Sequence, residues 1–345
     1  MEQKSPRILI TRLSAVGDCV HTMPLVGALR KHFPRAFIAW VTQGGPATLL
    51  HNYPGLDRVI VVPRGYLKSV STVWRVRREL RSLNFNIAID PQSLTKSSIL
   101  GWLSGARHRI GFAAPQGREL ALWLNSDRIH PRRTHVVERY LELLRPLVGD
   151  TPLSAEFQLP HSCQPAVDAF MNRLGNSPKF AVINPGAGWD SKLWLPERFA
   201  EVGQHLLQHH NLPSVVVWAG EREQAWAEQI VRESQGAAIM APDTTLPELA
   251  AILRRAQLCV AADTGPLHLA AAVDTPCVGL YGTTRPCDCG PYGLIHQSVQ
   301  AYYHDGSARE RRTATNDAMR AIEVHHVTQA CDQVLAAVAQ ARHVA

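Results

Sequence analysis

Short apolar runs recur along the chain and alternate with segments in which apolar residues follow helical spacing. The runs that suit strands are residues 7–11, 37–42, 59–62, 87–90, 180–184, 214–218, 258–262 and 277–281. The segments of helical spacing are residues 19–33, 72–83, 96–103, 166–174, 196–209, 223–233, 246–254, 267–273 and 327–341. Such alternation is typical of parallel sheets covered by helices. We therefore predict an α/β fold of two Rossmann-like, doubly wound halves that face a central cleft.

The alternation is interrupted at residues 150–178, where polar, proline-containing stretches surround one short helix. A chain of 345 residues is long enough for two domains of ordinary size. We place an N-terminal domain at residues 1–160, a C-terminal domain at 161–325 and a last helix at 326–345, which we expect to pack back on the N-terminal domain. The basic residues 309–312 are predicted to form an exposed loop.

One loop in the second half has the features of an anion-binding site. Asp263-Thr264-Gly265 follows an apolar strand and leads directly into a helix that begins near Pro266. Free amides and the helix dipole favour an anion at such a helix start, and Gly265 lets a phosphate approach the backbone. His268, one turn further, could add a donor. The alternative is that Asp263 and Thr264 only cap the helix.

The first loop of the chain places a carboxylate at a second helix start. Gly17 permits a tight turn, and Asp18 follows it where the helix dipole favours an ionised side chain. An ionised aspartate at the mouth of a cleft can accept a proton from an attacking hydroxyl. We therefore consider Asp18 a candidate general base, with an ordinary N-cap as the alternative.

Two further loops of the second half carry candidate ligands. Lys192 ends a glycine-containing loop after strand 180–184 and could meet a phosphate. Glu221 follows strand 214–218 and could accept hydrogen bonds from the vicinal hydroxyls of a ribose. The alternatives are a solvated lysine and a surface glutamate. Neither a Walker A loop nor a dinucleotide fingerprint is present here.

Charge is distributed unevenly along the chain. Residues 1–160 contain 22 Lys/Arg and 11 Asp/Glu, whereas residues 161–345 contain 14 and 18. The basic half favours an acidic partner, such as nucleic acid, an anionic membrane surface or a phosphorylated substrate. No nucleic-acid recognition motif or aromatic stacking platform is visible, so we expect no nucleic-acid partner. Candidate contacts to an acidic acceptor are Arg64, Arg107, Arg109 and Arg118.

The cysteine content and the absence of long apolar runs bear on location. Seven scattered cysteines fit a reducing compartment better than a disulfide framework. No apolar run reaches the roughly 18 residues needed to span a bilayer, and no signal-peptide pattern is present. We expect a cytoplasmic protein. Cys287 and Cys289 do not have the spacing of a usual zinc pair, so we expect no metal there.

Two regions of the sequence resemble the N-terminal and C-terminal signatures of the lipopolysaccharide heptosyltransferases, glycosyltransferase family 9. The N-terminal segment is Ile8-Leu-Ile-Thr-Arg-Leu-Ser-Ala-Val-Gly-Asp-Cys-Val-His-Thr-Met-Pro24. The C-terminal segments are Asp263-Thr-Gly-Pro-Leu-His-Leu-Ala-Ala-Ala272, Leu280-Tyr-Gly-Thr-Thr284 and Gly290-Pro-Tyr-Gly293. Their order and separation also fit, and the resemblance covers nearly the whole chain.

The resemblance implies a GT-B fold, in which the first domain binds the acceptor and the second binds the nucleotide-sugar. It implies inverting transfer of heptose from ADP-heptose to Kdo or heptose of the inner core of lipopolysaccharide, with no metal or other cofactor strictly required. The partners would be the donor, an anionic lipid-linked saccharide and, for a peripheral protein, the inner face of the inner membrane.

The same resemblance assigns roles to individual residues. Asp18 would be the general base, Lys192 would meet the donor phosphate, and Glu221 would hold the ribose. Asp263 would contact the sugar, and the diphosphate would lie among Thr264, Gly265 and His268.

Residues 286–289 differ from the family's usual run, and the loop after Asn184 matches only loosely. These departures leave another nucleotide-sugar as an alternative donor. A nucleotide-sugar epimerase or an NAD-dependent enzyme on similar Rossmann halves is an alternative of a different enzyme class, against which the missing dinucleotide fingerprint counts. A non-catalytic binding module is a further alternative.

Overall fold

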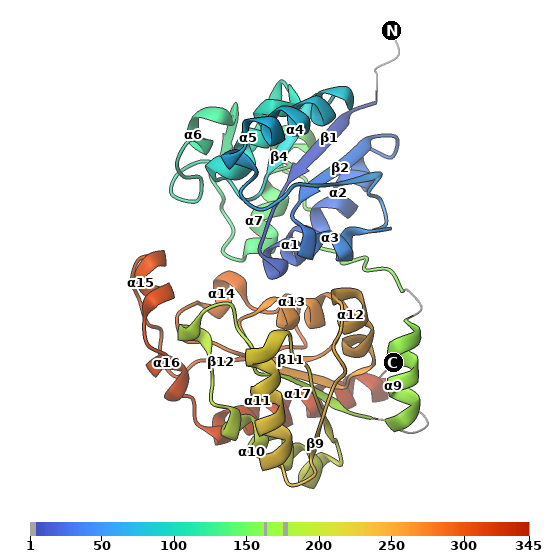
Figure 1. Ribbon diagram of the computed structural model, residues 1–345, viewed down its shortest axis with the longest axis vertical. Helices are drawn as coiled ribbons and strands as arrows, with labels where there is room; N and C mark the ends of the chain where they lie inside the picture. The colour runs from blue at the N-terminus through green and yellow to red at the C-terminus, as the bar shows by residue number, and fades with distance from the viewer. Residues whose placement is uncertain (1–4, 162–163, 175–178, 345) are drawn as a thin grey trace. The chain divides into compact units, whose positions relative to one another are not determined.

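The computed structural model describes residues 5–161, 164–174 and 179–344 (Figure 1). The chain divides into two compact units, Met1–Pro160 and His161–Ala345. Part of the predicted link, residues 162–163 and 175–178, lies outside the described residues. Each unit contains one six-stranded sheet, and every pair of neighbouring strands is parallel.

The first unit is built on a sheet with strand order β3-β2-β1-β4-β5-β6. Its strands are β1 (Arg7–Thr11), β2 (Phe37–Thr42), β3 (Arg58–Val61), β4 (Ile87–Asp90), β5 (His108–Phe112) and β6 (Asp127–Ile129). Its helices are α1 (Val16–Thr22), α2 (Pro24–His32), α3 (Gly44–Leu50), α4 (Val70–Ser82), α5 (Thr95–Ser104), α6 (Ala121–Leu124), α7 (Val136–Glu142) and α8 (Arg145–Val148). Strands β1 and β2 are buried at every position after the first, as expected where helices cover both faces of a parallel sheet.

The second unit is built on a sheet with strand order β12-β11-β10-β7-β8-β9. Its strands are β7 (Ala181–Asn184), β8 (Ser214–Val216), β9 (Ala238–Met240), β10 (Leu258–Ala262), β11 (Cys277–Leu280) and β12 (Gln297–Val299). Its helices are α9 (Pro165–Leu174), α10 (Pro196–His210), α11 (Gly220–Glu233), α12 (Leu246–Arg255), α13 (Gly265–Ala272), α14 (Pro286–Cys289), α15 (Ala308–Thr313), α16 (Asp317–Arg320) and α17 (Val324–Val344). Apolar side chains of α10, α11 and α17 share one buried core with the central strands.

The two sheets repeat one strand order. Counted within its own unit, each sheet runs 3-2-1-4-5-6, the order of a dinucleotide-binding Rossmann sheet. The direction in which the chain adds strands to the sheet reverses between β1 and β4 in the first unit, and between β7 and β10 in the second. Ligands of such sheets bind outside the carboxyl ends of the strands at this reversal. The fold therefore directs attention to Asp18 after β1 and to Asp263 after β10.

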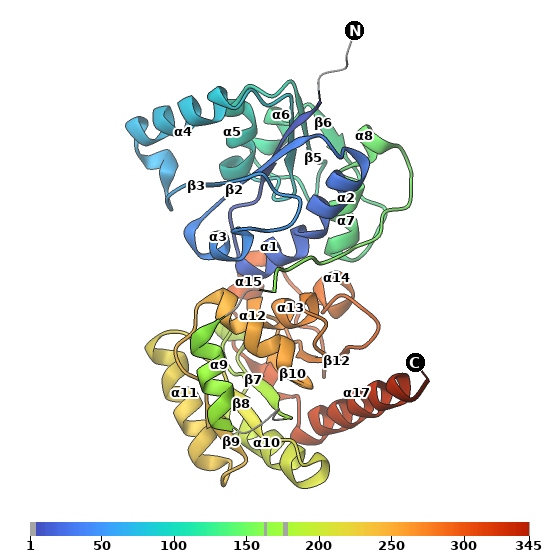
Figure 2. The same ribbon diagram turned by 90° about the vertical axis from the view of Figure 1, so that its right-hand side faces the viewer.

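Several predicted elements differ in detail from the structure. The helix predicted for residues 19–33 is two helices, because Pro24 lacks the amide hydrogen that a continuing helix needs and instead begins α2. The basic segment predicted as a loop is helix α15. The last helix, α17, packs on α10, β11 and β12 of its own unit, and its packing on the first half stays a prediction. Figure 2 shows α17 running out to the right of the second unit.

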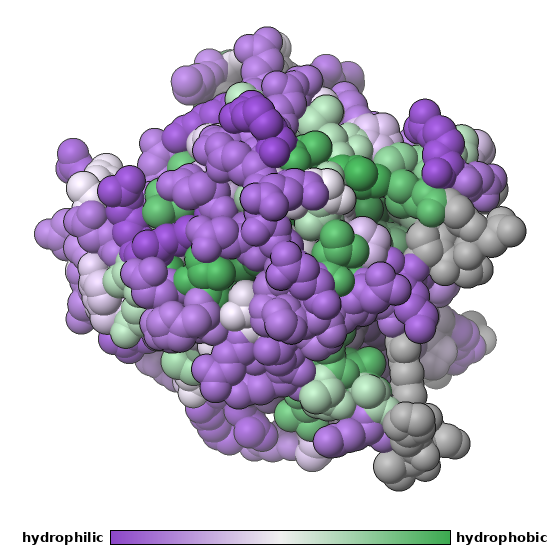
Figure 3. All heavy atoms as spheres, turned by 90° about the horizontal axis from the view of Figure 1, so that it is seen from below, coloured by the Kyte–Doolittle hydropathy of each residue, from purple (hydrophilic) through white to green (hydrophobic). Residues whose placement is uncertain are grey.

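Nothing in the described part of the chain is suited to crossing a bilayer as a helix. The face shown in Figure 3 carries mainly hydrophilic residues, and hydrophobic residues show through in several places, most extensively toward the upper right. The larger exposed apolar side chains include Trp74 of α4 and Trp123 of α6, which are 62% and 85% exposed.

Candidate active site

A buried carboxylate is the centre of a polar cluster in the second unit. This cluster, the Asp263 group, consists of Asp263, Lys192, His268 and Thr284. Asp263 follows β10 directly, and only 7% of it is exposed. Its Oδ2 accepts from Lys192 Nζ at 2.5 Å and from Thr284 Oγ1 at 2.7 Å. Its Oδ1 accepts from His268 Nε2 at 2.9 Å. Three segments of the chain, at residues 192, 263–268 and 284, therefore meet at one side chain.

The charge of Asp263 is stabilised by these neighbours. Burial alone would raise its pKa, but the hydrogen bond from His268 and the positive charge of Lys192 outweigh burial and hold the pKa well below its usual range. The carboxylate therefore stays ionised over the whole physiological range. His268 is itself buried, and its Nε2 is directed at Asp263. In this arrangement the imidazole orients the carboxylate.

The start of α13 is not capped by a side chain. Thr264 occupies the N-cap position without a side-chain hydrogen bond to the helix, and the printed contacts of Asp263 go to other groups. The capping alternative for this loop is therefore not supported. The first amides of α13, such as that of Gly265, have no intrahelical partner and can serve an anion.

Lys192 is positioned by a short 3₁₀ helix, η2 (Asp190–Lys192), in the loop after β7. Its Nζ lies 4.4 Å from the centroid of the Trp189 ring, and the guanidinium of Arg312 lies 5.4 Å from the same centroid. Ser191 Oγ donates to the backbone carbonyl of Arg311 at 2.7 Å, which attaches α15 to this loop. Our sequence reasoning missed both arginines as neighbours of Lys192.

Further polar groups in this region were given no role in the site from the sequence. Within the described residues, the buried hydroxyls of Tyr281 and Thr283 have no hydrogen-bond partner. Cys289 Sγ lies 3.9 Å from Asp263 Oδ2, so the unusual 286–289 segment reaches the carboxylate directly. Cys287, two residues earlier, is exposed. A signal was available in the sequence, since Thr284 and Cys289 lie in the segment that follows the carboxyl end of β11.

Glu221 is exposed in the first turn of α11, whereas Glu223 of the same turn lies inward. Glu223 accepts from the Ala219 amide at 2.9 Å, and burial raises its pKa. A Cβ added at Gly186, in the loop after β7, would lie 2.1 Å from Glu223 Oε1. Gly186 is therefore the residue that makes room for the Glu223 carboxyl.

The first unit carries its own carboxylate after β1. Asp18 is in the first turn of α1, where Oδ2 accepts from the Ala15 amide at 3.1 Å and Oδ1 pairs with Arg12 at 2.6 Å. Its side chain is 44% exposed, whereas that of Arg12 is 7% exposed. Asp18 is therefore not the N-cap of α1 that the alternative predicted, because Ala15 occupies that position. Its side chain accepts from the Ala15 amide from within the first turn and still presents an open face.

Arg12, which the sequence did not indicate as a site residue, holds the Asp18 carboxylate through the buried ion pair described above. Burial alone would lower the pKa of Arg12, but the charge of Asp18 more than offsets burial, and the guanidinium stays charged. Arg12 also donates to the carbonyl of Pro91 at 3.1 Å and lies 5.3 Å from the centroid of the Tyr140 ring. The pair therefore joins the ends of β1 and β4 at the reversal of the sheet.

The four candidate acceptor arginines fall into two groups. Arg64 follows β3, and the Arg118 amide donates to the carbonyl of Ser93 beyond β4, so both lie at the carboxyl edge of the sheet with Asp18. Arg107 and Arg109 lie at the amino end of β5, the opposite edge. Arg109 donates to the carbonyls of Leu124 and Ala106 at 2.6 and 2.7 Å. The structure does not bring this second group to Asp18.

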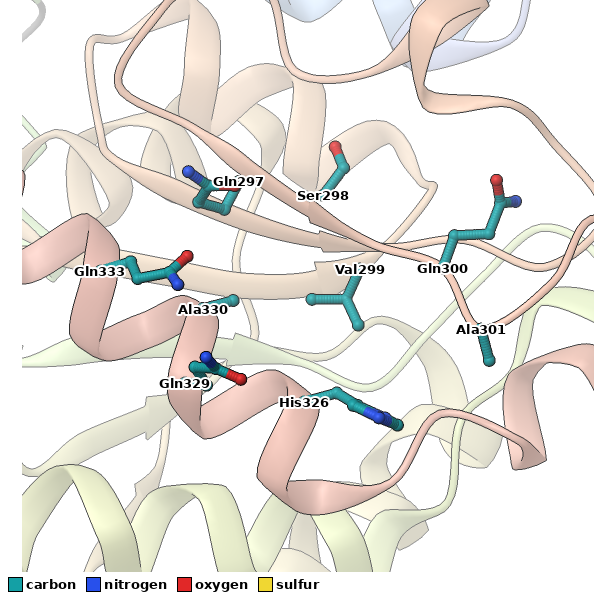
Figure 4. Close-up of a pocket in the computed structure, with 9 residues that line it drawn as sticks. All are labelled: Gln297, Ser298, Val299, Gln300, Ala301, His326, Gln329, Ala330 and Gln333. Atoms are coloured by element: carbon teal, nitrogen blue, oxygen red, sulfur yellow. The ribbon is translucent and has the colours of Figure 1, made fainter.

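A separate hollow of about 290 Å³ lies between β12 and α17 (Figure 4). Four glutamines line it, Gln297 and Gln300 from the strand side and Gln329 and Gln333 from the helix. No described residue of the Asp263 group lines it.

Two Rossmann-like units, each with charged side chains at the reversal of its sheet, define a fold of the GT-B class. The profile of glycosyltransferase family 9 (heptosyltransferase) matches residues 73–318, and the chain belongs to this family. It is therefore a glycosyltransferase.

Relatives over most of the chain agree with this assignment. The lipopolysaccharide core heptosyltransferase OpsX of Haemophilus influenzae is 26% identical over 306 residues, which cover 87% of this chain and 86% of that protein. Lipopolysaccharide heptosyltransferase 1 of Pseudomonas aeruginosa is 29% identical over 307 residues, which cover 83% and 81%.

Solved structures are similar in fold. The glycosyl transferase family 9 protein of Veillonella parvula aligns with a TM-score of 0.80 at 24% identity and covers 97% of this chain and 98% of that one. The Escherichia coli heptosyltransferase WaaC with ADP aligns with a TM-score of 0.75 at 25% identity and covers 95% and 99%.

Proposed function

We propose that this enzyme transfers heptose from ADP-heptose to the inner core of lipopolysaccharide, with inversion at the anomeric carbon. Relatives across most of the chain are lipopolysaccharide heptosyltransferases, and WaaC has been solved with ADP-2-deoxy-2-fluoro heptose. The observation that carries the proposal is the Asp263 group at the uncapped start of α13, which suits an anionic donor.

The donor subsite in this proposal is the second unit. Lys192 and the first amides of α13 hold the diphosphate and stabilise the charge that develops on the leaving ADP. Asp263 binds the hydroxyls of the sugar, and His268 positions Asp263. Glu221, exposed in the first turn of α11, is the candidate for the ribose. Metal is not required in this proposal, because Lys192 and the first amides of α13 supply the positive charge that meets the diphosphate.

The acceptor step in this proposal belongs to the first unit. Asp18 takes the proton of the acceptor hydroxyl, and the oxygen forms a bond to the anomeric carbon on the face opposite the diphosphate. The bond from that carbon to the phosphate oxygen breaks, and ADP leaves with the electron pair. Arg12 keeps the Asp18 carboxylate in place, and Arg64 and Arg118 are the candidates for the anionic acceptor.

We also propose that the protein is cytoplasmic and attaches peripherally to the inner face of the inner membrane. Helix α4 exposes Val70 and Trp74, which are 75% and 62% exposed, and the guanidinium of Arg77 lies 5.3 Å from the centroid of the Trp74 ring. Basic helices with aromatic residues at the surface favour anionic headgroups. Trp74→Ser should reduce cosedimentation with phosphatidylglycerol vesicles, whereas Leu294→Ser, at an exposed site of the second unit, should not.

A donor screen tests the central proposal. Purified enzyme with a heptose-deficient lipopolysaccharide acceptor should release ADP from ADP-heptose and add one heptose, as seen by mass spectrometry. Transfer from a uridine or guanosine diphosphate sugar, with none from ADP-heptose, would contradict the donor assignment. Conversion of the sugar without any acceptor would favour an epimerase.

A further inference from the structure

Two imidazoles and one carboxylate converge on the side of the second unit formed by α10 and α17. His205 Nε2 lies 2.8 Å from Asp332 Oδ1, and His210 Nε2 lies 2.6 Å from the same oxygen. The ligand atoms of the three residues all lie within 4.8 Å of one another. None of these residues belongs to the group around Asp263 or to that around Asp18.

The chemistry of the cluster matches a transition-metal site. Two imidazole nitrogens and one carboxylate oxygen are a common ligand set for Zn²⁺, with water in the fourth position. Ligands of a tetrahedral ion at about 2.1 Å lie roughly 3.4 Å apart. The two nitrogen–oxygen distances would therefore open by under about 1 Å to admit an ion.

The position in the fold favours a cation as well. His210 is the last residue of α10, where the helix dipole presents its negative end. His205 and His210 are 22% and 27% exposed and Asp332 is 46% exposed, so an ion can reach the site from solvent. A third imidazole, His209, has its ring centroid 4.5 Å from that of His205, but it is not one of the three residues whose ligand atoms converge.

We propose that His205, His210 and Asp332 bind one divalent transition-metal ion of the Zn²⁺ type. The ion joins α10 to α17, whose inner face buries Cys331 and Val334 in the core of the second unit. Its effect is on the stability of this unit, because a ligand that binds only the folded state raises the melting temperature. The proposal does not depend on the sugar that the enzyme transfers.

The test uses the full-length, tag-free protein stripped with EDTA and titrated with ZnCl₂. One Zn²⁺ per chain should bind saturably and raise the melting temperature. His210→Gln and Asp332→Asn should each weaken Zn²⁺ binding by at least about tenfold. Loss of a residue that only hydrogen-bonds to a metal ligand commonly lowers metal affinity by that much, and these two residues are ligands themselves. His209→Gln, on the same helix but outside the cluster, should bind as the wild type does.

Co²⁺ provides an independent readout, because its visible absorption reports nitrogen and oxygen ligands. The spectrum should be lost in Asp332→Asn and kept in His209→Gln. Absence of saturable binding, or binding unchanged in both His210→Gln and Asp332→Asn, would overturn the proposal and leave the cluster as an ion pair between two helices.

Discussion

Lys192 Nζ lies 2.5 Å from Asp263 Oδ2, so the cation that we assign to the donor diphosphate already has a carboxylate partner within its own unit. Both side chains are largely buried, at 13% and 7% exposed. A diphosphate that reaches Lys192 therefore joins an existing ion pair. Because the pair is shielded from solvent, removal of either partner should leave the other as an unpaired buried charge.

Lys192→Gln should weaken ADP binding by about 10- to 100-fold, since a hydrogen bond to a charged group contributes about 1.5–3 kcal/mol. Isothermal titration with ADP measures this directly. Lys192→Arg should recover part of the affinity, and Lys179→Gln, at an exposed site of the same unit, should bind ADP normally. Unchanged affinity in Lys192→Gln would remove Lys192 from the donor subsite.

Asp18→Asn should lower the rate of transfer by about 10²–10⁴, the usual contribution of a general base. The amide oxygen can still accept from the Ala15 amide, so the start of α1 should be kept. ADP affinity should stay within about twofold of the wild type. Asp127→Asn is the matched control, because Asp127 is a partly exposed carboxylate of the same unit. A variant at Asp18 with near-normal turnover would refute its assignment as the base.

Asp90 should make the first unit less stable as the pH rises. Burial raises the pKa of Asp90 to about 6 from 3.8, despite hydrogen bonds from Ser97 and Ser93. Between pH 4 and 6 the folded state therefore binds more protons than the unfolded state, and the free energy of unfolding falls by up to about 3 kcal/mol. Asp90→Asn should lose this decline in urea unfolding measured from pH 4 to 7. An identical pH profile in the variant would show that another group is responsible.

Gly186→Ala should destabilise the second unit by about 1–3 kcal/mol, a typical cost of overpacking. The added methyl group would overlap the Glu223 carboxyl, which must then leave the Ala219 amide. Gly188→Ala is the control, since a Cβ at Gly188 meets no atom within 4 Å. In a Glu223→Ala background, Gly186→Ala should cost much less stability, and a double-mutant cycle should report this difference as a coupling between the two positions. Equal stability of the two glycine variants by thermal unfolding would contradict this account.

The sequence predicted the features that local pattern controls. Strands β1, β2, β4 and β10 were predicted at the residues where they occur, because each is a short apolar run ended by polar or turn residues. The Asp263 loop was predicted as an anion site from its strand, its glycine and the following proline. Its uncapped helix start agrees with that interpretation.

Contacts between distant segments could not be predicted in the same way. Nothing near Asp18 in the sequence indicates that Arg12 turns back to pair with it, and Thr284 reaches Asp263 only because β11 lies beside β10. Helix α15 has no apolar residues at helical spacing, so the sequence pattern predicts a loop there. Ser307 and Glu310, which form a capping box at its start, were the signal that could have identified it.

The repeated 3-2-1-4-5-6 strand order has a consequence for how such enzymes diversify. Each half has its own sheet and its own buried core, so neither depends on the other for its internal register. Changes after β10 can retune the choice of activated sugar while the framework behind Asp18 stays intact, and the reverse also holds. Chimaeras joined near Pro160 should therefore inherit donor preference from one parent and acceptor preference from the other.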